Sequence, residues 1–288
     1  MQKLLNIVAT LLLGCVIAVA ILIVSQVLWA GLLLANLKLS PAVPWAAVVM
    51  IPLLAAMVMA LGGIGWPKAG AETRRRLVPL RLVPWRAFAW AMAAGGFGIA
   101  ALSGLWIVLA GLMKTAPNAL PSERGIPPLT VVVLLAVSIL AAPITEEIAF
   151  RGYVMGMLRR VISPTWAILL SSLVFAAAHL SQGLYADKLL VYFLGGLAFA
   201  FVAYRTGSLI PAMIVHSAAD LTFFTLVWPH DAGRRLVSEG GADAWFWIHV
   251  AQVVLFGALC VWAYARLARA TASDAEPAAI AVAHPAPA

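Results

Sequence analysis

Charged residues are scarce in this chain. Asp, Glu, Lys and Arg make up 10% of its 288 residues, whereas hydrophobic residues make up 64% and the mean hydropathy is +1.01. A soluble globular domain needs a largely polar surface, so this composition excludes that class. Cysteine is also rare: Cys15 and Cys260 both lie inside apolar runs and form no CxxC or Cys/His pattern. Both are therefore interpreted as small buried hydrophobes.

What the chain has instead is a series of apolar stretches, most of them about 20 residues long, which predict a polytopic membrane protein. We expect an all-α transmembrane bundle of about eight spans, with both termini in the cytoplasm. The first run is too long for a signal peptide. The predicted spans are residues 4–37, 45–66, 87–113, 129 to about 160, 165–180, 189–204, 208–227 and 245–265.

The net charge of +8 does not indicate nucleic-acid binding, because the basic residues lie in loops between the apolar runs. The most basic loop, residues 67–86, contains a single acidic residue, Glu72. By the positive-inside rule this loop is cytoplasmic, although a nucleic-acid or lipid-headgroup patch remains an alternative for it. Its basic residues are Lys68, Arg74, Arg75, Arg76, Arg81 and Arg86.

Two adjacent carboxylates, Glu146 and Glu147, follow an apolar run and are placed where hydrocarbon is expected. One charged carboxylate at bilayer depth costs roughly 2.5–3.5 kcal/mol on insertion scales, so the pair indicates a function. Glu147 and Arg151 are four residues apart and share a helix face. We therefore assign Glu147 to an ion pair with Arg151 and Glu146 to the chemistry. The alternative is that all three only hold helices together.

Three further polar residues, His179, His216 and Asp220, lie in other apolar runs. Hairpin lengths predict that His179 lies at a depth similar to Glu146, and His216 and Asp220 share a helix face. A carboxylate with an imidazole can take a proton from water, and a second imidazole can stabilise an oxyanion. Each histidine alone could instead serve helix packing. The weaker alternative is a zinc site made by Glu146 and these three residues, since neither spacing is a standard zinc helix.

The motifs resemble those of the CPBP family of intramembrane proteases, which includes the CAAX prenyl proteases and the bacterial Abi proteins. The E-E-x-x-x-R motif runs from Glu146 to Arg151, and the F-x-x-x-H motif from Phe175 to His179. A glycine-containing stretch from Phe193 then leads to His216. The resemblance covers residues from about 129 to 228. It implies a glutamate-type peptidase.

By this resemblance, Glu146 would be the general base for the attacking water, assisted by His179. Glu147 and Arg151 would brace the site, and His216 with residue 220 would form the oxyanion site. The family usually has Asn where this chain has Asp220. An ionised carboxylate cannot donate a hydrogen bond to an oxyanion. Four interpretations of Asp220 are therefore open: it is protonated, it orients His216, it helps hold a metal, or it impairs activity. We interpret it as orienting His216.

The sequence therefore predicts an intramembrane endopeptidase that cuts near the C-terminus of a membrane-bound or lipid-modified protein. We expect it in a bacterial inner membrane, with its site facing the cytoplasm and no cofactor required, a divalent metal such as zinc being the alternative. A non-catalytic scaffold or bacteriocin-immunity-type protein is the alternative function. A transporter is less favoured because no internal repeat is evident.

This interpretation divides the chain into four parts. Their order follows the apolar runs and the motifs, and the Ala/Pro-rich last part is predicted to be disordered. The parts are N-terminal helices with the basic loop (1–128), the catalytic helical core (129–228), an outer loop with the last span (229–269), and the tail (270–288).

Overall fold

The computed structural model describes residues 1–113, 125–230 and 235–273, and in these ranges the chain is helical and contains no strand. The all-α prediction is confirmed. The main helices are α1 (Gln2–Leu39), α2 (Trp45–Leu61), α3 (Ala71–Leu77), α4 (Trp85–Leu112), α5 (Pro128–Glu147), α6 (Gly156–Leu158), α7 (Pro164–Ala178), α8 (Ala186–Thr206), α9 (Ile210–Thr222), α10 (Val237–Gly240) and α11 (Ala244–Ser273). Short π- or 3-10-helical segments join some of them, namely η1 (Ile148–Met155), η2 (His179–Gln182), η3 (Phe223–Val227) and η4 (Trp228–His230).

Six of these helical segments are long and apolar enough to cross a membrane, judged by length and composition. One of them is the continuous run from α5 through η1 to α6, and two shorter apolar helices, α2 and α7, occupy the places of the second and fifth predicted spans. Large apolar side chains such as Leu12, Val16 and Val261 are 60–71% exposed. Such an outer surface suits contact with lipid chains rather than water. The number of eight spans and the cytoplasmic termini stay predictions.

Several boundaries differ from the predicted ones. Helix α2 stops at Leu61 rather than 66, because the glycines that follow leave the helical conformation, Gly63 having φ +70°. The basic loop contains the unpredicted short helix α3. Helix α11 continues past 265 to Ser273, since its alanine-rich end favours helix, and so takes in the start of the predicted tail. Residues 274–288 and 114–124 lie outside the described residues.

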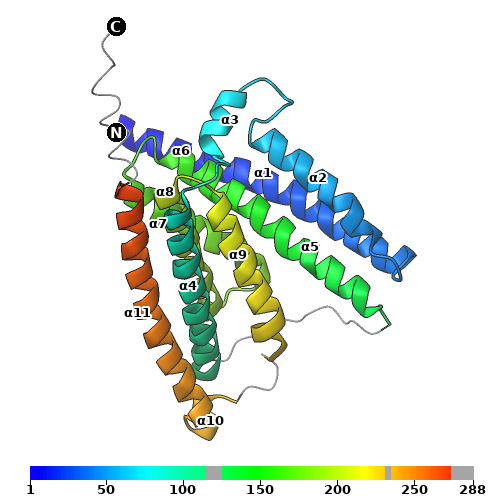
Figure 1. The fold of residues 1–288 in the computed structure, drawn as a ribbon, viewed down its shortest axis with the longest axis vertical. Helices are drawn as coiled ribbons and strands as arrows, with labels where there is room; N and C mark the ends of the chain where they lie inside the picture. Colours follow the sequence, from blue (N-terminus) through cyan, green and yellow to red (C-terminus); the bar gives the residue numbers. More distant parts are fainter. Residues whose placement is uncertain (114–124, 231–234, 274–288) are drawn as a thin grey trace.

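The helices form two groups that diverge toward one end of the bundle, as Figure 1 shows. Helices α1, α2 and α5 pack together, and α4 packs with α8 and α11, while α9 contacts α5, α4 and α8 and so joins the groups. The approach of α4 to α9 depends on Gly95. A Cβ added there would lie 2.4 Å from Val215 Cγ2, so only glycine permits this helix separation.

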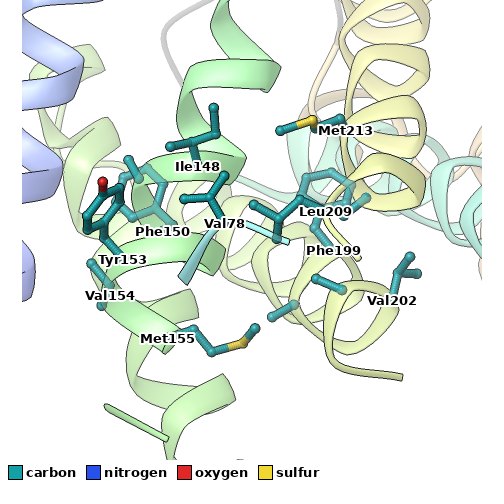
Figure 2. Close-up of a cluster of buried hydrophobic side chains, with 14 of the residues drawn as sticks. Val78, Ile148, Phe150, Tyr153, Val154, Met155, Phe199, Val202, Leu209 and Met213 are labelled. Carbon is teal, nitrogen blue, oxygen red and sulfur yellow. The ribbon is translucent and has the colours of Figure 1, made fainter. Parts of the chain in front are cut away.

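The centre of the core is the π-helical segment η1, in which all eight residues are buried. Figure 2 shows its side chains, including Ile148 and Phe150, gathered with Val78, Phe199 and Leu209 from three other parts of the chain. A π-helical turn within a longer helix is uncommon and is found often at functional sites. Here it follows directly after Glu147, so the tightly packed core holds the end of α5 in place.

Candidate active site

Glu146 and Glu147 are the last two residues of α5, and they face different surroundings. The side chain of Glu147 is fully buried, whereas that of Glu146 is 14% exposed. Glu146 lines a cavity of about 760 Å³, and Glu147 does not line it. Adjacent positions on a helix are rotated by about 100°, which accounts for the separation.

Glu147 lies at the centre of a buried polar network. Its Oε1 is 2.9 Å from Arg151 Nη1, which is the contact that the i,i+4 spacing predicts. The same oxygen accepts a hydrogen bond of 2.9 Å from Nδ1 of His216. Buried charges persist only when they are paired and hydrogen-bonded, and here a cation and an imidazole supply the partners.

Arg151 is itself held on three sides. Its Nη2 donates to the carbonyl oxygen of Gly196 at 3.0 Å, and its guanidinium carbon lies 4.4 Å from the ring centroid of Phe175. Gly196 allows α8 to approach α7, because an added Cβ would lie 3.1 Å from Ser172 Cβ. The close approach of these helices thus brings a backbone acceptor to a buried cation.

His216 connects the buried network to the cavity, which it lines together with Glu146 and Asp220. Because Nδ1 donates to the carboxylate of Glu147, Nε2 is the nitrogen left for the cavity side. This Nε2 lies 3.7 Å from Glu146 Oε2 and 3.7 Å from Asp220 Oδ1. Both distances exceed a direct hydrogen bond, and the contacts are ionic only when the imidazole is protonated. The imidazole also stacks on Phe199, with centroids 4.3 Å apart.

His179 begins η2, just after α7, and also lines the cavity. Its Nδ1 is 2.8 Å from the carbonyl oxygen of Phe175. A carbonyl oxygen only accepts, so Nδ1 carries the proton and Nε2 of the neutral ring is an acceptor. The ring stacks on Tyr192 at a centroid distance of 4.0 Å. No hydrogen bond or ion pair joins His179 to Glu146 in the described part of the chain.

The rest of the cavity wall is largely apolar. Its lining residues come from α1, α4, α5, α7, α8 and α9 and from the short segments η1, η2, η3 and η4. The wall includes Leu22, Ile23, Leu102, Trp106, Phe223 and Trp228. A few polar groups converging in an apolar hollow of this size are the usual arrangement of a small-molecule or catalytic pocket, which is typically about 300–1,000 Å³.

The six residues predicted for the site therefore fall into two sets. Glu146, His179, His216 and Asp220 line the cavity, and Glu147 with Arg151 lies behind it. Within residues 1–113, 125–230 and 235–273, no three His, Cys, Asp or Glu side chains are arranged to hold a metal ion. This geometry gives no support to the zinc alternative.

Sequence reasoning missed the contacts that cross between helices. It did not pair Glu147 with His216, and it gave no role to Gly196 or to the stacked rings of Tyr192 and Phe199. Small adjacent residues such as Gly195 and Gly196 favour close helix packing, but they do not show which polar atom the packing brings near. Aromatic residues are common throughout the chain, so no local signal marked these two.

Comparison with known proteins agrees with the motifs. Residues 128–222 match the model of the Rce1-like family, described as type II CAAX prenyl endopeptidases. Neither a search of curated proteins nor one of solved structures found a match. The matched segment runs from the first residue of α5 to the last of α9 and includes every residue placed in the site. Residues 128–222, which hold the candidate active site, are thus similar to the CAAX prenyl protease family, and they lie in a chain whose long apolar helices indicate an integral membrane protein.

Proposed function

We propose that the protein is an intramembrane endopeptidase in which Glu146 activates a water molecule. The observation that carries this proposal is the division of the glutamate pair, with Glu146 on the cavity wall and Glu147 in a buried ion pair. A carboxylate at the edge of an apolar hollow can accept a proton from water, which then attacks a peptide carbonyl carbon. The C–N bond breaks, and the proton passes to the departing amine.

The oxyanion formed by that attack needs a hydrogen-bond donor to stabilise its negative charge. In its protonated form, His216 can donate from Nε2, because Glu147 occupies Nδ1. Asp220 contacts this same Nε2, and it is therefore an electrostatic neighbour of the donor rather than the group that orients the ring. We assign the orienting role to Glu147. His179, with Nε2 as an acceptor, is placed to assist proton transfer through water.

The substrate that fits best is a protein with a lipid-modified C-terminus. The family description names CAAX prenyl endopeptidases, and apolar residues from α1 and α4 line the cavity together with Glu146. A prenyl chain needs such an apolar wall, since hydrocarbon is stabilised by leaving water. We further propose that the enzyme resides in a bacterial inner membrane, with its site opening toward the cytoplasm.

The test is cleavage of a peptide that ends in a prenylated C-a-a-X sequence by the purified full chain in proteoliposomes. Mass spectrometry identifies the bond that is cut. Glu146→Gln should lower the rate about 10²–10⁴-fold, since it removes a general base. A matched peptide without the prenyl group measures the contribution of the lipid.

Two further measurements distinguish the glutamate mechanism from a metal-dependent one and from a non-catalytic scaffold. A chelator should leave the rate unchanged, and loss of activity that added zinc restores would replace the glutamate mechanism with a metal one. A cellular phenotype that persists in Glu146→Gln, with no cleavage by either protein, would favour the non-catalytic scaffold.

A further inference from the structure

A second cavity, of about 600 Å³, lies at the end of the bundle that holds α3 and α6, the upper end in Figure 1. Its wall comes from three separate parts of the chain: α3 with the segment after it, the end of η1 through α6 and the turn that follows, and the end of α8 with the turn into α9. We call it the arginine cavity. Its polar wall consists mainly of Arg76, Arg81, Arg151, Arg159 and Arg160, and no acidic residue lines it.

The positive charge of this cavity is only partly neutralised. Arg76 pairs with Glu72, and Arg151 pairs with Glu147. The remaining three, Arg81, Arg159 and Arg160, have no acidic partner among the residues that the structure describes. An excess of unpaired guanidinium groups around one hollow attracts an anion.

Two of these arginines are positioned by neutral contacts. Arg81 Nε donates to the carbonyl oxygen of Gly207 at 2.9 Å, and the Arg159 guanidinium carbon lies 4.8 Å from the ring centroid of Tyr204. An arginine has five N–H donors, so the single bond from Arg81 leaves its terminal donors for a ligand. The contacts therefore orient the groups without neutralising them.

Arg151 is the buried member of the five arginines. Its side chain is fully buried, it lines the arginine cavity, and its Nε is buried without a hydrogen-bond partner in the described part of the chain. That nitrogen has no surface exposed to the cavity, so the donors offered to a ligand are those of the exposed arginines, Arg81, Arg159 and Arg160. Orientation of the protein in the membrane explains why the loops are basic, but it does not explain why five arginines from three segments converge on one hollow.

Planar guanidinium groups match the oxygen atoms of phosphate in pairs, which distinguishes this ligand from a simple halide. The cavity lies where α8 ends and α9 begins, a turn that we expect at the membrane surface. Phosphate groups of anionic lipids are concentrated at that level and attract basic residues. We propose that the arginine cavity binds the phosphate group of an anionic phospholipid headgroup. The proposal does not rest on peptidase activity.

The test measures thermal unfolding of the full chain in a neutral detergent. One arm adds short-chain phosphatidylglycerol, a second adds phosphatidylcholine of the same chain length, and a third adds inorganic phosphate against chloride at equal ionic strength. We expect a saturable rise in Tm with phosphatidylglycerol and none with phosphatidylcholine or chloride. A rise with phosphatidylglycerol alone, or with both phosphatidylglycerol and phosphate, supports the lipid headgroup.

The matched variants are Arg160→Gln and Arg86→Gln. Both residues are exposed arginines near the same end of the bundle, but Arg86 does not line the cavity. Arg160→Gln should raise the phosphatidylglycerol concentration needed for half of the Tm shift about fivefold, and Arg86→Gln should not. Arg160→Lys, which keeps the charge, should fall between the unaltered chain and Arg160→Gln.

Three results would overturn the proposal. The first is no saturable shift with phosphatidylglycerol. The second is an equal loss of affinity in Arg160→Gln and Arg86→Gln, which would indicate diffuse attraction to the whole basic surface. The third is a shift with inorganic phosphate but not with phosphatidylglycerol, which would assign the cavity to a soluble phosphate compound.

Discussion

Glu147 and His216, which are 69 residues apart in the chain, share a buried hydrogen bond of 2.9 Å between Oε1 and Nδ1. Through this contact the end of α5 determines which nitrogen of His216 faces the cavity. The same carboxylate oxygen also pairs with Arg151, so the side chain of Glu147 contacts both the buried cation and the histidine that lines the cavity. The predictions below test this network, the cavity residues near it and the packing of α4 against α9.

The first prediction concerns stability. Glu147→Ala should lower the free energy of unfolding by roughly 3–5 kcal/mol, because it leaves the buried guanidinium of Arg151 without a counter-charge. Thermal or denaturant unfolding in detergent measures the change. The double variant Glu147→Gln/Arg151→Met removes both charges and should recover a large part of the loss.

Glu146→Gln is the matched control for that change, because the neighbouring glutamate faces the cavity rather than the ion pair. It should leave the unfolding midpoint nearly unchanged while it lowers the rate of cleavage about 10²–10⁴-fold. Equal destabilisation by Glu146→Gln and Glu147→Ala would contradict the division of roles between the two carboxylates.

The second prediction distinguishes a proton-transfer role of His179 from a role in packing alone. His179→Ala should reduce kcat/KM by about 10²-fold or more, as expected for a group that assists proton transfer. Tyr192→Phe keeps the aromatic ring against which His179 stacks, so it should retain most of the activity. A rate for His179→Ala within a fewfold of the unaltered enzyme would confine this histidine to packing.

The third prediction is that Asp220→Asn increases activity. The carboxylate lies 3.7 Å from His216 Nε2, where it opposes negative charge on an oxyanion, whereas an amide at this position can donate to it. We expect kcat to rise by roughly tenfold, somewhat less than the loss seen when an oxyanion donor is removed. Steady-state kinetics with the prenylated peptide provide the measurement. A fall in kcat would instead show that Asp220 takes part in proton transfer.

The fourth prediction tests the packing of α4 against α9. Gly95→Ala should destabilise the protein by roughly 1–3 kcal/mol, since the new Cβ would overlap the side chain of Val215. The adjacent Gly96 provides the control, because a Cβ there meets nothing within 4 Å. Gly96→Ala should be neutral or slightly stabilising in unfolding measurements. Equal effects at the two positions would mean that α4 and α9 can separate at little cost.

The properties that the sequence by itself determined are those set by composition and by local spacing. Its long apolar runs specify a helical membrane protein, because the backbone has no other partner in hydrocarbon. The four-residue spacing of Glu147 and Arg151 brings them together on any helix, so their contact needed no tertiary information. The order of the motifs was likewise sufficient to predict the similarity of residues 128–222 to the CAAX prenyl protease family.

Only the tertiary structure decided how the helices bring distant groups together. The hydrogen bond from His216 to Glu147, the carbonyl of Gly196 beneath Arg151, and the convergence of Arg81 with Arg160 all join segments far apart in the chain. Each depends on helix separation and rotation, which small residues and the buried π-helical turn of η1 set to within a few ångströms. Sequence periodicity shows which face of a helix is apolar. It does not show which polar atom of another helix will meet that face.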